Sequence, residues 1–398
     1  MIQGHNIIAF CNDWDGDPLS KKQIVQRLAR HNRILWVNST GNRNPQLSAH
    51  DLRRAWKKLR EFVRGCRGVA ENIWLFCPLV IPFHASAFAR RFNRWALGWS
   101  LRRAGKRLGF EDPLVLTFVP TSADVVGQLE ARIIVYYCVD EYSQFSGANA
   151  DAILQHELRL IGSSDLVVVS ATRLLQTKSP HHANTCLITH GVDVEHFRKA
   201  CLPDTPVPED CPAMQGPVIG FFGLIENWVD LNLIRRIAMD RPNWNFLLIG
   251  EIRTDVDGLR HCPNVHLLGR KPYQSLPGYC KRFDVAILPF VENDLTLAAN
   301  PLKLREYLAA GLPVVATPLP EVRKLEGLVH LARTPAEYIR QIDTLLGTGK
   351  HGPHMGWSLR MDNESWDYKV EELSRHIQRT LSGKPVAPAA SLQKGQAA

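Results

Sequence analysis

The feature of this sequence that most restricts its fold is an alternation of short apolar runs with helix-like segments, which occurs twice. In the N-terminal half the runs read NIIAF, RILWVN, NIWLFCPLVI, PLVLTFV, RIIVYYCVD, LVVVSA and TCLITHGVD. In the C-terminal half they read PVIGFFGLI, WNFLLIGE, NVHLLGRK, FDVAILPF and LPVVATP. Runs that are rich in Val, Ile and Leu and do not alternate with polar residues are typical of strands buried on both faces of a parallel sheet. The sequence therefore predicts two α/β domains.

A stretch without periodicity, ACLPDTPVPEDCPAMQGP, separates the two series and is dense in proline and acidic residues. It predicts an interdomain linker at residues 201–216, between an N-terminal domain at 1–200 and a C-terminal domain at 217–350. Residues 355–382 are expected to form a helical segment that packs back across the linker. Residues 385–398 have low hydrophobicity, and we expect them to be disordered.

The composition limits where in the cell the protein is expected and which kinds of partner it is expected to bind. No apolar run approaches the roughly 20 residues that cross a bilayer, and the N-terminus has no basic region followed by an apolar stretch. We therefore expect a cytosolic chain. The nine cysteines are scattered, with no spacing that resembles a metal site, so we expect reduced thiols and no bound metal. The net charge of +9 indicates an anionic partner, which is a nucleic acid, an anionic membrane or a phosphorylated substrate.

Basic residues concentrate in RRAWKKLREFVRGCR and in residues 88–107, FARRFNRWALGWSLRRAGKR. On a helix, the second stretch combines an aromatic stripe with basic flanks, which is typical of a segment that lies on an anionic membrane. The alternative is a helix that faces the core and has a solvated basic side. Nucleic-acid binding would require the aromatics to line a groove, and we do not expect a nucleic-acid partner.

The candidate binding site follows the run FDVAILPF, because ligands of open parallel sheets bind outside the carboxyl ends of the strands. There Pro301 suits the first turn of a helix and Gly311 suits its end. A diphosphate is expected to rest on the N–H groups around Leu302 and Lys303, with the Lys303 charge beside it. Glu306, one turn further on, is placed to accept hydrogen bonds from ribose hydroxyls. The alternative is the exposed side of an ordinary amphipathic helix.

The run NPLKLREYLAAGLPVVAT resembles the donor-binding signature of GT-B glycosyltransferases, especially the retaining bacterial enzymes of surface and exopolysaccharide biosynthesis (glycosyl transferases group 1). Glu306 matches the second glutamate of that signature, and Gly311, Pro313, Val314 and Val315 match its Gly-x-Pro-Val-Val. ITHGVDVEHF resembles the family's Asn-Gly-Val-Asp-x-x-x-Phe element, with His190 in place of the asparagine. The resemblance implies two Rossmann-like domains whose parallel sheets face each other across a cleft, an N-terminal one for the acceptor and a C-terminal one for the nucleotide sugar.

The sequence departs from this family at the first glutamate of the signature. That residue is expected eight positions before Glu306, where this chain has Ala298. The polar contact to the donor sugar then falls to one of the nearby residues Asn293, Asp294, Thr296 or Asn300.

A second departure concerns the phosphate ligand. The strand VIGFFGLIENW resembles the family's glycine-bearing strand and loop, but no Arg or Lys follows Gly223 until Arg235. Charge neutralisation is then left to Lys303, Arg270 or Lys271, of which Arg270 is preferred. The stretch NVHLLGRK also resembles the family's nucleotide-base loop, which implies that Gly269 and Arg270 contact the base. The donor-binding residues implied are Gly223, Arg270, Asn300, Pro301, Leu302, Lys303 and Glu306.

In the N-terminal half, a loop with Asn12, Asp13, Trp14 and Gly16 follows the first predicted strand. The strand RIIVYYCVD ends at Asp140 and Glu141, the candidate catalytic carboxylates, one of which is placed to orient or deprotonate an acceptor hydroxyl. The alternative is that both only cap the following helix.

Together these features predict a hexosyltransferase-like enzyme that moves a sugar from a nucleotide-diphosphate donor to a lipid-linked or saccharide acceptor. No DxD motif stands at a strand end, so metal-independent transfer without a cofactor is expected. The resemblance implies retention, and the basic stretch at residues 88–107 predicts peripheral contact with the inner face of the plasma membrane. A non-catalytic scaffold that binds nucleotide sugars and a GT-B sugar-nucleotide epimerase remain alternatives. The sugar, the base and the acceptor stay open.

Overall fold

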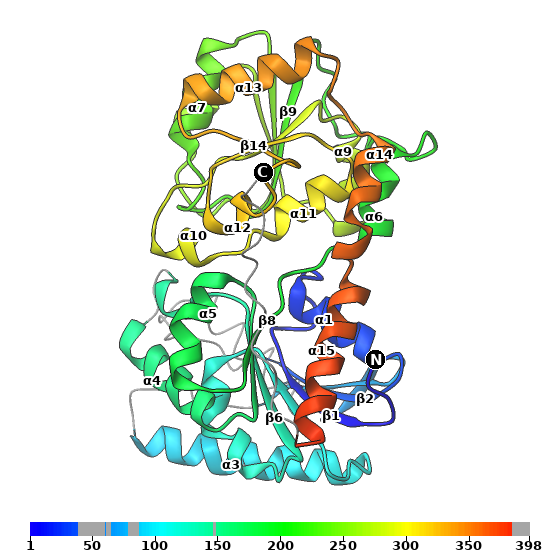
Figure 1. The fold of residues 1–398 in the computed structure, drawn as a ribbon, viewed down its shortest axis with the longest axis vertical. Coiled ribbons are helices and arrows are strands. Elements are labelled where there is room, and N and C mark those ends of the chain that lie inside the picture. Colours follow the sequence, from blue (N-terminus) through cyan, green and yellow to red (C-terminus); the bar gives the residue numbers. More distant parts are fainter. Residues whose placement is uncertain (39–59, 61–64, 79–86, 146–148, 384–398) are drawn as a thin grey trace, which may run out of the picture. The chain divides into compact units, whose positions relative to one another are not determined.

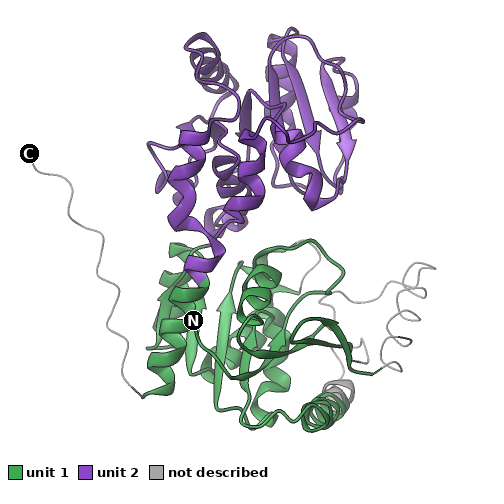
Figure 2. Cartoon of the chain, turned by 90° about the vertical axis from the view of Figure 1, so that its right-hand side faces the viewer, with its two compact units in different colours: residues 1–189, 370–398 green, residues 190–369 purple. Residues whose placement is uncertain are grey.

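The computed structural model describes residues 1–38, 60, 65–78, 87–145 and 149–383. These residues form two compact units, one of Met1–Thr189 with the segment from Val370 onward, and one of His190–Lys369 (Figure 2). The predicted tail at 385–398 and most of the basic stretch RRAWKKLREFVRGCR lie outside the described residues.

The first unit is built on an eight-stranded sheet with the order β3-β4-β2-β1-β5-β6-β7-β8 (Figure 1). Neighbouring strands are parallel except for β3 and β4. Each of the seven N-terminal apolar runs contains a strand, which confirms the prediction. The eighth, β3, is a mostly exposed edge strand and carries no apolar run. The strands are β1 Asn6–Phe10, β2 Arg33–Val37, β3 Arg67–Ala70, β4 Ile73–Phe76, β5 Leu114–Thr117, β6 Ile133–Cys138, β7 Leu166–Val169 and β8 Thr185–Leu187.

The second unit contains a parallel six-stranded sheet with the order β11-β10-β9-β12-β13-β14. Every residue of β9, β12 and β13 is buried, as expected where helices cover both faces of a sheet. The five predicted runs are confirmed as strands, whereas the two-residue β14 was not predicted. The strands are β9 Val218–Phe222, β10 Asn245–Ile249, β11 Val265–Gly269, β12 Val285–Leu288, β13 Val314–Ala316 and β14 His330–Leu331.

The helices of the first unit lie between its strands along the chain. Helix α4 buries Ile153, Leu160 and Ile161 on one side, and the Asn149 side chain caps its first turn. Short 3-10 turns follow β5 and β6, at Pro120–Asp124, Val126–Gln128 and Tyr142–Gln144. The helices are α1 Ser20–Leu28, α3 Ala87–Arg107, α4 Ala150–Gly162 and α5 Thr172–Lys178.

The helices of the second unit enclose its sheet in two apolar layers. On one face, Ile234 of α7 and Ile342 of α13 pack with Phe246 of β10, and Figure 1 shows these two helices side by side. On the other face, α11 packs through Leu304 and Leu308. The helices are α6 Val194–Arg198, α7 Leu231–Asp240, α8 Asp257–Arg260, α9 Leu276–Cys280, α10 Asp294–Ala298, α11 Leu302–Ala309, α12 Pro320–Arg323, α13 Pro335–Gly347 and α14 Met355–Ser358.

The segment 201–216, for which the sequence predicts a linker, lies inside the second unit, as do residues 190–200. It is held by polar contacts, because the Lys281 ammonium donates to the carbonyl oxygens of Leu202 and Thr205 at 2.8 and 2.9 Å. Upstream, the N–H of Val192 donates to the carbonyl of Glu364 at 2.9 Å. Residues 192, 202 and 205 make these hydrogen bonds through their backbone groups, so the contacts require no apolar pattern in the sequence.

The chain returns to the first unit through helix α15, Trp366–Leu381, which begins in the second unit and ends in the first. It occupies the second part of the predicted helical segment 355–382. The first part consists of the short helix α14 and a 3-10 turn at Leu359–Glu364.

Gly220 provides a test of the tight packing in the second unit. It lies in β9, and a Cβ atom added there would lie 2.1 Å from ring atoms of the buried Phe283. We expect Gly220→Ala to lower the unfolding free energy by about 1–3 kcal/mol or more, because a packed core does not accept an extra methyl group. The control is Gly347→Ala at the end of α13, where the added atom meets open space. Equal stabilities of the two variants in urea unfolding would show that the core at β9 has room for a methyl group.

Candidate functional site

At the carboxyl edge of the second sheet, two glycines have no side chain to shield the backbone. Gly223 follows β9 and Gly250 follows β10, and the Gly223 N–H donates to the Ile249 carbonyl at 2.9 Å. A Cβ atom at position 250 would lie 1.7 Å from the Gly223 carbonyl oxygen, so only glycine fits there. Glycines that bring two chain segments this close also allow a ligand to approach the backbone.

Helix α11 is fastened to this edge by Tyr307. The buried Tyr307 hydroxyl accepts a hydrogen bond from the Phe222 N–H at 2.9 Å and donates to the Phe222 carbonyl at 3.0 Å. The two rings also meet edge to face, with centroids 4.7 Å apart. Helix α11 follows Pro301, which is its N-cap residue, whereas the sequence predicts this proline in the first turn. Gly311 lies just beyond its C-cap with a φ of +73°, which suits glycine as predicted. The position of α11 is therefore set by the last residue of β9.

Lys303 and Glu306 form an ion pair beside Gly223. The Lys303 ammonium lies 2.7 Å from Glu306 Oε2, and the Glu306 side chain is almost fully buried. A Cβ atom at Gly223 would lie 3.7 Å from the Cε of Lys303. Three of the residues predicted to bind the donor thus lie together. The N-terminal end of α11 carries the positive end of the helix dipole, and Lys303 adds a positive charge there. No acidic residue lies in the first turn, so this end of the helix favours an anion.

The loop before α11 is held by Arg305, a residue that was not predicted from the sequence. Arg305 is buried and donates to the Asn300 side-chain oxygen at 2.6 Å and to Glu364 at 3.0 Å. Burial, with Arg305 and Lys369 nearby, lowers the pKa of His190 to about 3, so this histidine is neutral at pH 7. No pattern in the sequence singles out Arg305, because its partners Asn300 and Glu364 are brought to it by the fold.

The other cations considered for the phosphate lie elsewhere on the sheet. Arg270 is exposed and follows β11, which is separated from β9 by β10. Lys271 donates a hydrogen bond to Asp210 in the segment that was predicted as a linker. Of the three candidates, Lys303 is the one whose contacts place it beside Gly223.

Ala298, which stands where the family has its first glutamate, is buried at the end of α10. Two of the polar residues considered as its replacement build the start of that helix. The Asn293 side chain accepts from the Thr296 N–H at 3.0 Å, and the Thr296 hydroxyl accepts from the Asn293 N–H at 2.9 Å. Asp294 is exposed in the first turn, and Asn300 is bonded to Arg305.

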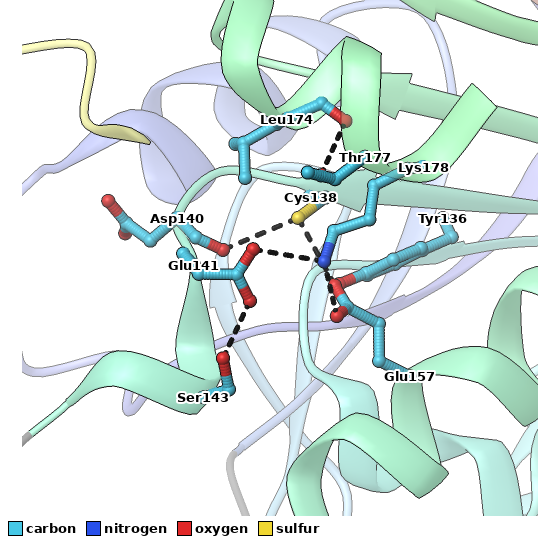
Figure 3. Close-up of polar contacts among 9 residues, drawn as sticks. All are labelled: Tyr136, Cys138, Asp140, Glu141, Ser143, Glu157, Leu174, Thr177 and Lys178. Atoms are coloured by element: carbon cyan, nitrogen blue, oxygen red, sulfur yellow. Dashed lines mark hydrogen bonds and ion pairs between the residues drawn. The ribbon is translucent and has the colours of Figure 1, made fainter. Parts of the chain in front are cut away.

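In the first unit, Glu141 belongs to a partly buried ion-pair network (Figure 3). The Lys178 ammonium lies 3.0 Å from Glu141 Oε2 and 2.8 Å from Oε2 of the fully buried Glu157. Tyr136 donates to the other oxygen of Glu157 at 2.7 Å, and Ser143 donates to Glu141 at 2.8 Å. Burial alone would lower the pKa of Lys178, but the Glu157 carboxylate holds it above its ordinary value. The contacts of Glu141 are therefore structural.

Asp140, the residue before Glu141, points away from Lys178 in Figure 3. Its charged neighbour is Lys21 of α1, whose ammonium donates to the Asn12 side-chain oxygen at 2.9 Å. Burial raises the pKa of Asp140 to about 6, and Lys21 limits the rise. Asn12 follows β1 and Asp140 follows β6, so both lie at the carboxyl edge of the sheet. A carboxylate with a pKa near neutrality is suited to accept a proton.

The loop after β1 is anchored by aromatic and basic side chains. The Trp14 ring meets the Trp36 ring edge to face at 5.0 Å, and the Trp14 N–H donates to Asn38 at 3.0 Å. Lys22 donates to the Trp14 carbonyl at 2.8 Å. Asp13 and Gly16 are exposed. Lys21 and Lys22 were not predicted as site residues, although both lie in the first turn of α1, where no acidic residue is present and the helix dipole disfavours cations.

Metal clusters and membrane spans are both missing from the part of the chain that the structure describes. Across those ranges, no three or more His, Cys, Asp or Glu side chains are grouped as a metal ion would require. Within the same ranges, none of the helices combines the length and the apolar character needed to traverse a bilayer.

Residues 216–348 match the family described as Glycosyl transferases group 1. Among solved structures, sucrose-phosphate synthase from Thermosynechococcus elongatus has a TM-score of 0.69 and 14% identity, over 96% of this chain and 100% of that one. HepE from Anabaena in complex with UDP has a TM-score of 0.63 and 15% identity, also over 96% and 100%. The protein has the GT-B fold, and residues 216–348 of its second unit are similar to the group 1 glycosyltransferases. The predicted fold is therefore confirmed.

A curated relative is similar over part of the chain. It is a Bacillus subtilis protein, TuaH, whose name assigns it to teichuronic acid biosynthesis as a glycosyltransferase, and it is 27% identical over 210 residues. The alignment covers 48% of this chain and 52% of the relative, so it spans about half the length of each.

The network around Lys178 predicts a large effect on stability. Lys178→Met would leave Glu157 buried without a cation, so we expect the unfolding free energy to fall by about 3–5 kcal/mol. Arg241→Met is the control, since it breaks the exposed pair with Asp343 and is expected to cost at most about 1 kcal/mol. Urea unfolding of both variants measures the difference, and a loss of less than about 1 kcal/mol for Lys178→Met would show that this network is not structural.

Proposed function

We propose that this protein transfers a sugar from a nucleoside-diphosphate donor to an acceptor hydroxyl during the assembly of a cell-surface polymer. The observation that carries the proposal is the Lys303–Glu306 pair beside Gly223, inside the part of the chain that matches the group 1 family. The similarity to TuaH supports a cell-wall polymer as the product. The structures of HepE contain UDP and UDP-glucose, so UDP-sugars are the first donors to test.

In this proposal the donor diphosphate lies against Gly223 and the first turn of α11. Lys303 and the N–H groups at the start of that turn stabilise the negative charge that grows on the leaving diphosphate. When Lys303 turns to the phosphate, Glu306 is released to accept hydrogen bonds from the ribose hydroxyls. Because these groups supply the positive charge, we propose transfer without a divalent metal. Retention of the anomeric configuration is proposed from the family resemblance. Because base-assisted attack from the opposite face would invert the anomeric centre, retention requires the acceptor hydroxyl to attack from the face that the diphosphate leaves.

Asp140 is the proposed base for the acceptor hydroxyl. Its pKa of about 6 leaves it ionised at pH 7 and still basic enough to take a proton as the glycosidic bond forms. Glu141 is assigned a supporting part, because Lys178 and Ser143 already occupy its oxygens.

The proposed donor site predicts an effect on nucleotide binding. We expect Glu306→Ala to weaken UDP binding by roughly 10- to 100-fold, because hydrogen bonds to a charged group contribute about 1.5–3 kcal/mol. Isothermal titration calorimetry measures the change, and thermal unfolding checks that the variant is folded. Asp343→Ala, at an exposed position of α13, is the control and should bind UDP as the unaltered chain does. An unchanged affinity of Glu306→Ala would refute this assignment.

The proposed base predicts the pH dependence of turnover. Since burial raises the pKa of Asp140 to about 6, kcat/KM should fall as the pH drops below about 6 and the base becomes protonated. The Lys21 charge lowers the pKa of Asp140, so Lys21→Met should move the acid limb of the pH–rate profile, the fall in kcat/KM at low pH, to higher pH. Asp140→Asn should lower kcat by roughly 10²- to 10⁴-fold and abolish the limb.

Glu141→Gln is the matched control for Asp140→Asn, because the two residues are adjacent and only one is the proposed base. It should keep the acid limb at the same pH. An identical limb in Asp140→Asn and in the unaltered chain would assign the proton transfer to another group.

Product analysis separates this proposal from its two alternatives. A glycosyltransferase releases nucleoside diphosphate in step with a new glycoside. A non-catalytic scaffold binds the nucleotide sugar without turnover, and an epimerase converts it to an isomer in the absence of an acceptor. Turnover in EDTA tests the metal-independent part of the proposal, and the anomeric configuration of the product tests retention.

A further inference from the structure

Helix α3 carries a row of exposed aromatic side chains. Phe92, Trp95 and Trp99 are 42%, 62% and 52% exposed. They are spaced three and four residues apart and therefore share one face of the helix. The opposite face is buried, through Leu97, Leu101 and Ala104. The aromatic row thus stands on the side of α3 that faces away from the core, and Figures 1 and 2 show this helix along the outer margin of the first unit.

Cations surround this row. Arg91, Arg103 and Lys106 are exposed, and the Arg103 guanidinium lies 5.6 Å from the Trp99 ring centroid. The helix contains seven basic residues and no acidic one. Among the residues that the structure describes, no carboxylate forms an ion pair with these three cations. The exposed face of α3 therefore combines apolar rings with positive charge that the described part of the chain does not neutralise.

An exposed aromatic patch of this kind marks an interaction surface. A second copy of the same face would bring basic helices together without any acid, so charge opposes self-association through it. Single-stranded nucleic acid is bound in a positively charged groove, whereas these aromatics stand out from a helix ridge. An anionic bilayer suits both the aromatic row and the cations around it. Trp and Phe insert at the level of the headgroups, while Arg and Lys pair with the lipid phosphates.

We propose that α3 binds the surface of anionic membranes, with Trp95 and Trp99 inserted and the flanking cations on the headgroups. This surface shares no residue with the proposed donor site, which lies in the second unit. It does not require the proposed function, although it would hold the enzyme next to a lipid-linked acceptor. The membrane contact expected for residues 88–107 is proposed here for the exposed residues, while the side chains of Phe88 and Arg90 lie outside the described ones.

The test is flotation of the full chain with vesicles of phosphatidylcholine, with and without about 30% phosphatidylglycerol. The unaltered chain should bind the anionic vesicles, and the affinity should fall between ~0.1 M and ~0.5 M salt because screening weakens surface charge interactions. Arg103→Gln with Lys106→Gln should bind about thirtyfold more weakly. Trp95→Ser with Trp99→Ser should bind roughly tenfold more weakly or worse.

The control variants remove matched groups from the other unit. Arg236→Gln with Arg260→Gln deletes two exposed cations of α7 and α8, and Met239→Ser deletes an exposed apolar side chain. Both should bind vesicles as the unaltered chain does. UDP affinity should persist in the α3 variants, so a failure of the membrane surface is distinguishable from a failure of the donor site.

Several outcomes would overturn the proposal. These are no binding of the unaltered chain to anionic vesicles, equal binding by the α3 variants, or equal binding to neutral vesicles at all salt concentrations. If vesicles are not bound but the α3 variants lose affinity for a single-stranded oligonucleotide, the surface serves nucleic acid instead. If sedimentation shows a dimer that Trp95→Ser with Trp99→Ser dissociates, without vesicle binding, the face joins two copies.

Discussion

The candidate donor site depends on the pair of hydrogen bonds between the Tyr307 hydroxyl and the backbone of Phe222. Phe222 is the last residue of β9, so both of its polar groups would otherwise be buried at the sheet edge without these partners, at a cost of about 1–3 kcal/mol each. One side chain satisfies both and thereby sets the distance between α11 and the strand. Lys303, one turn earlier on the same helix, is brought beside Gly223 as a consequence.

The two units use the same electrostatic arrangement at the carboxyl edges of their sheets. Each begins a helix with a lysine in the first turn, Lys21 in α1 and Lys303 in α11, where the helix dipole disfavours a cation. Each lysine has a polar partner, Asn12 for Lys21 and Glu306 for Lys303. In the first unit the lysine also limits the pKa rise of Asp140. Positive charge held at such an edge is suited to anionic substrates and to a base that works near neutral pH.

Much of the fold was predictable from the sequence, because strands buried on both faces need continuous apolar runs. The exceptions have physical reasons. Strand β3 is an exposed edge strand, and the segment 201–216 is held by backbone carbonyls that bond to Lys281. Neither feature requires an apolar pattern. Of the candidate site, the helix start at Pro301 and its end at Gly311 were readable from residue types alone, since each depends on backbone preferences that are local to the chain.

The charged neighbours of Asp140 and Glu141 could not be predicted from the local sequence. The sequence by itself determined that two carboxylates follow a buried strand. The charged neighbours of the two adjacent residues come from side chains far along the chain, Lys178 for Glu141 and Lys21 for Asp140. Likewise the sequence placed Gly223 and Lys303 in separate motifs, and only the packing of α11 on β9 brought them together. Strands and helix ends follow from local preferences, whereas charge partners and pKa values depend on distances and burial that exist only after the chain has packed.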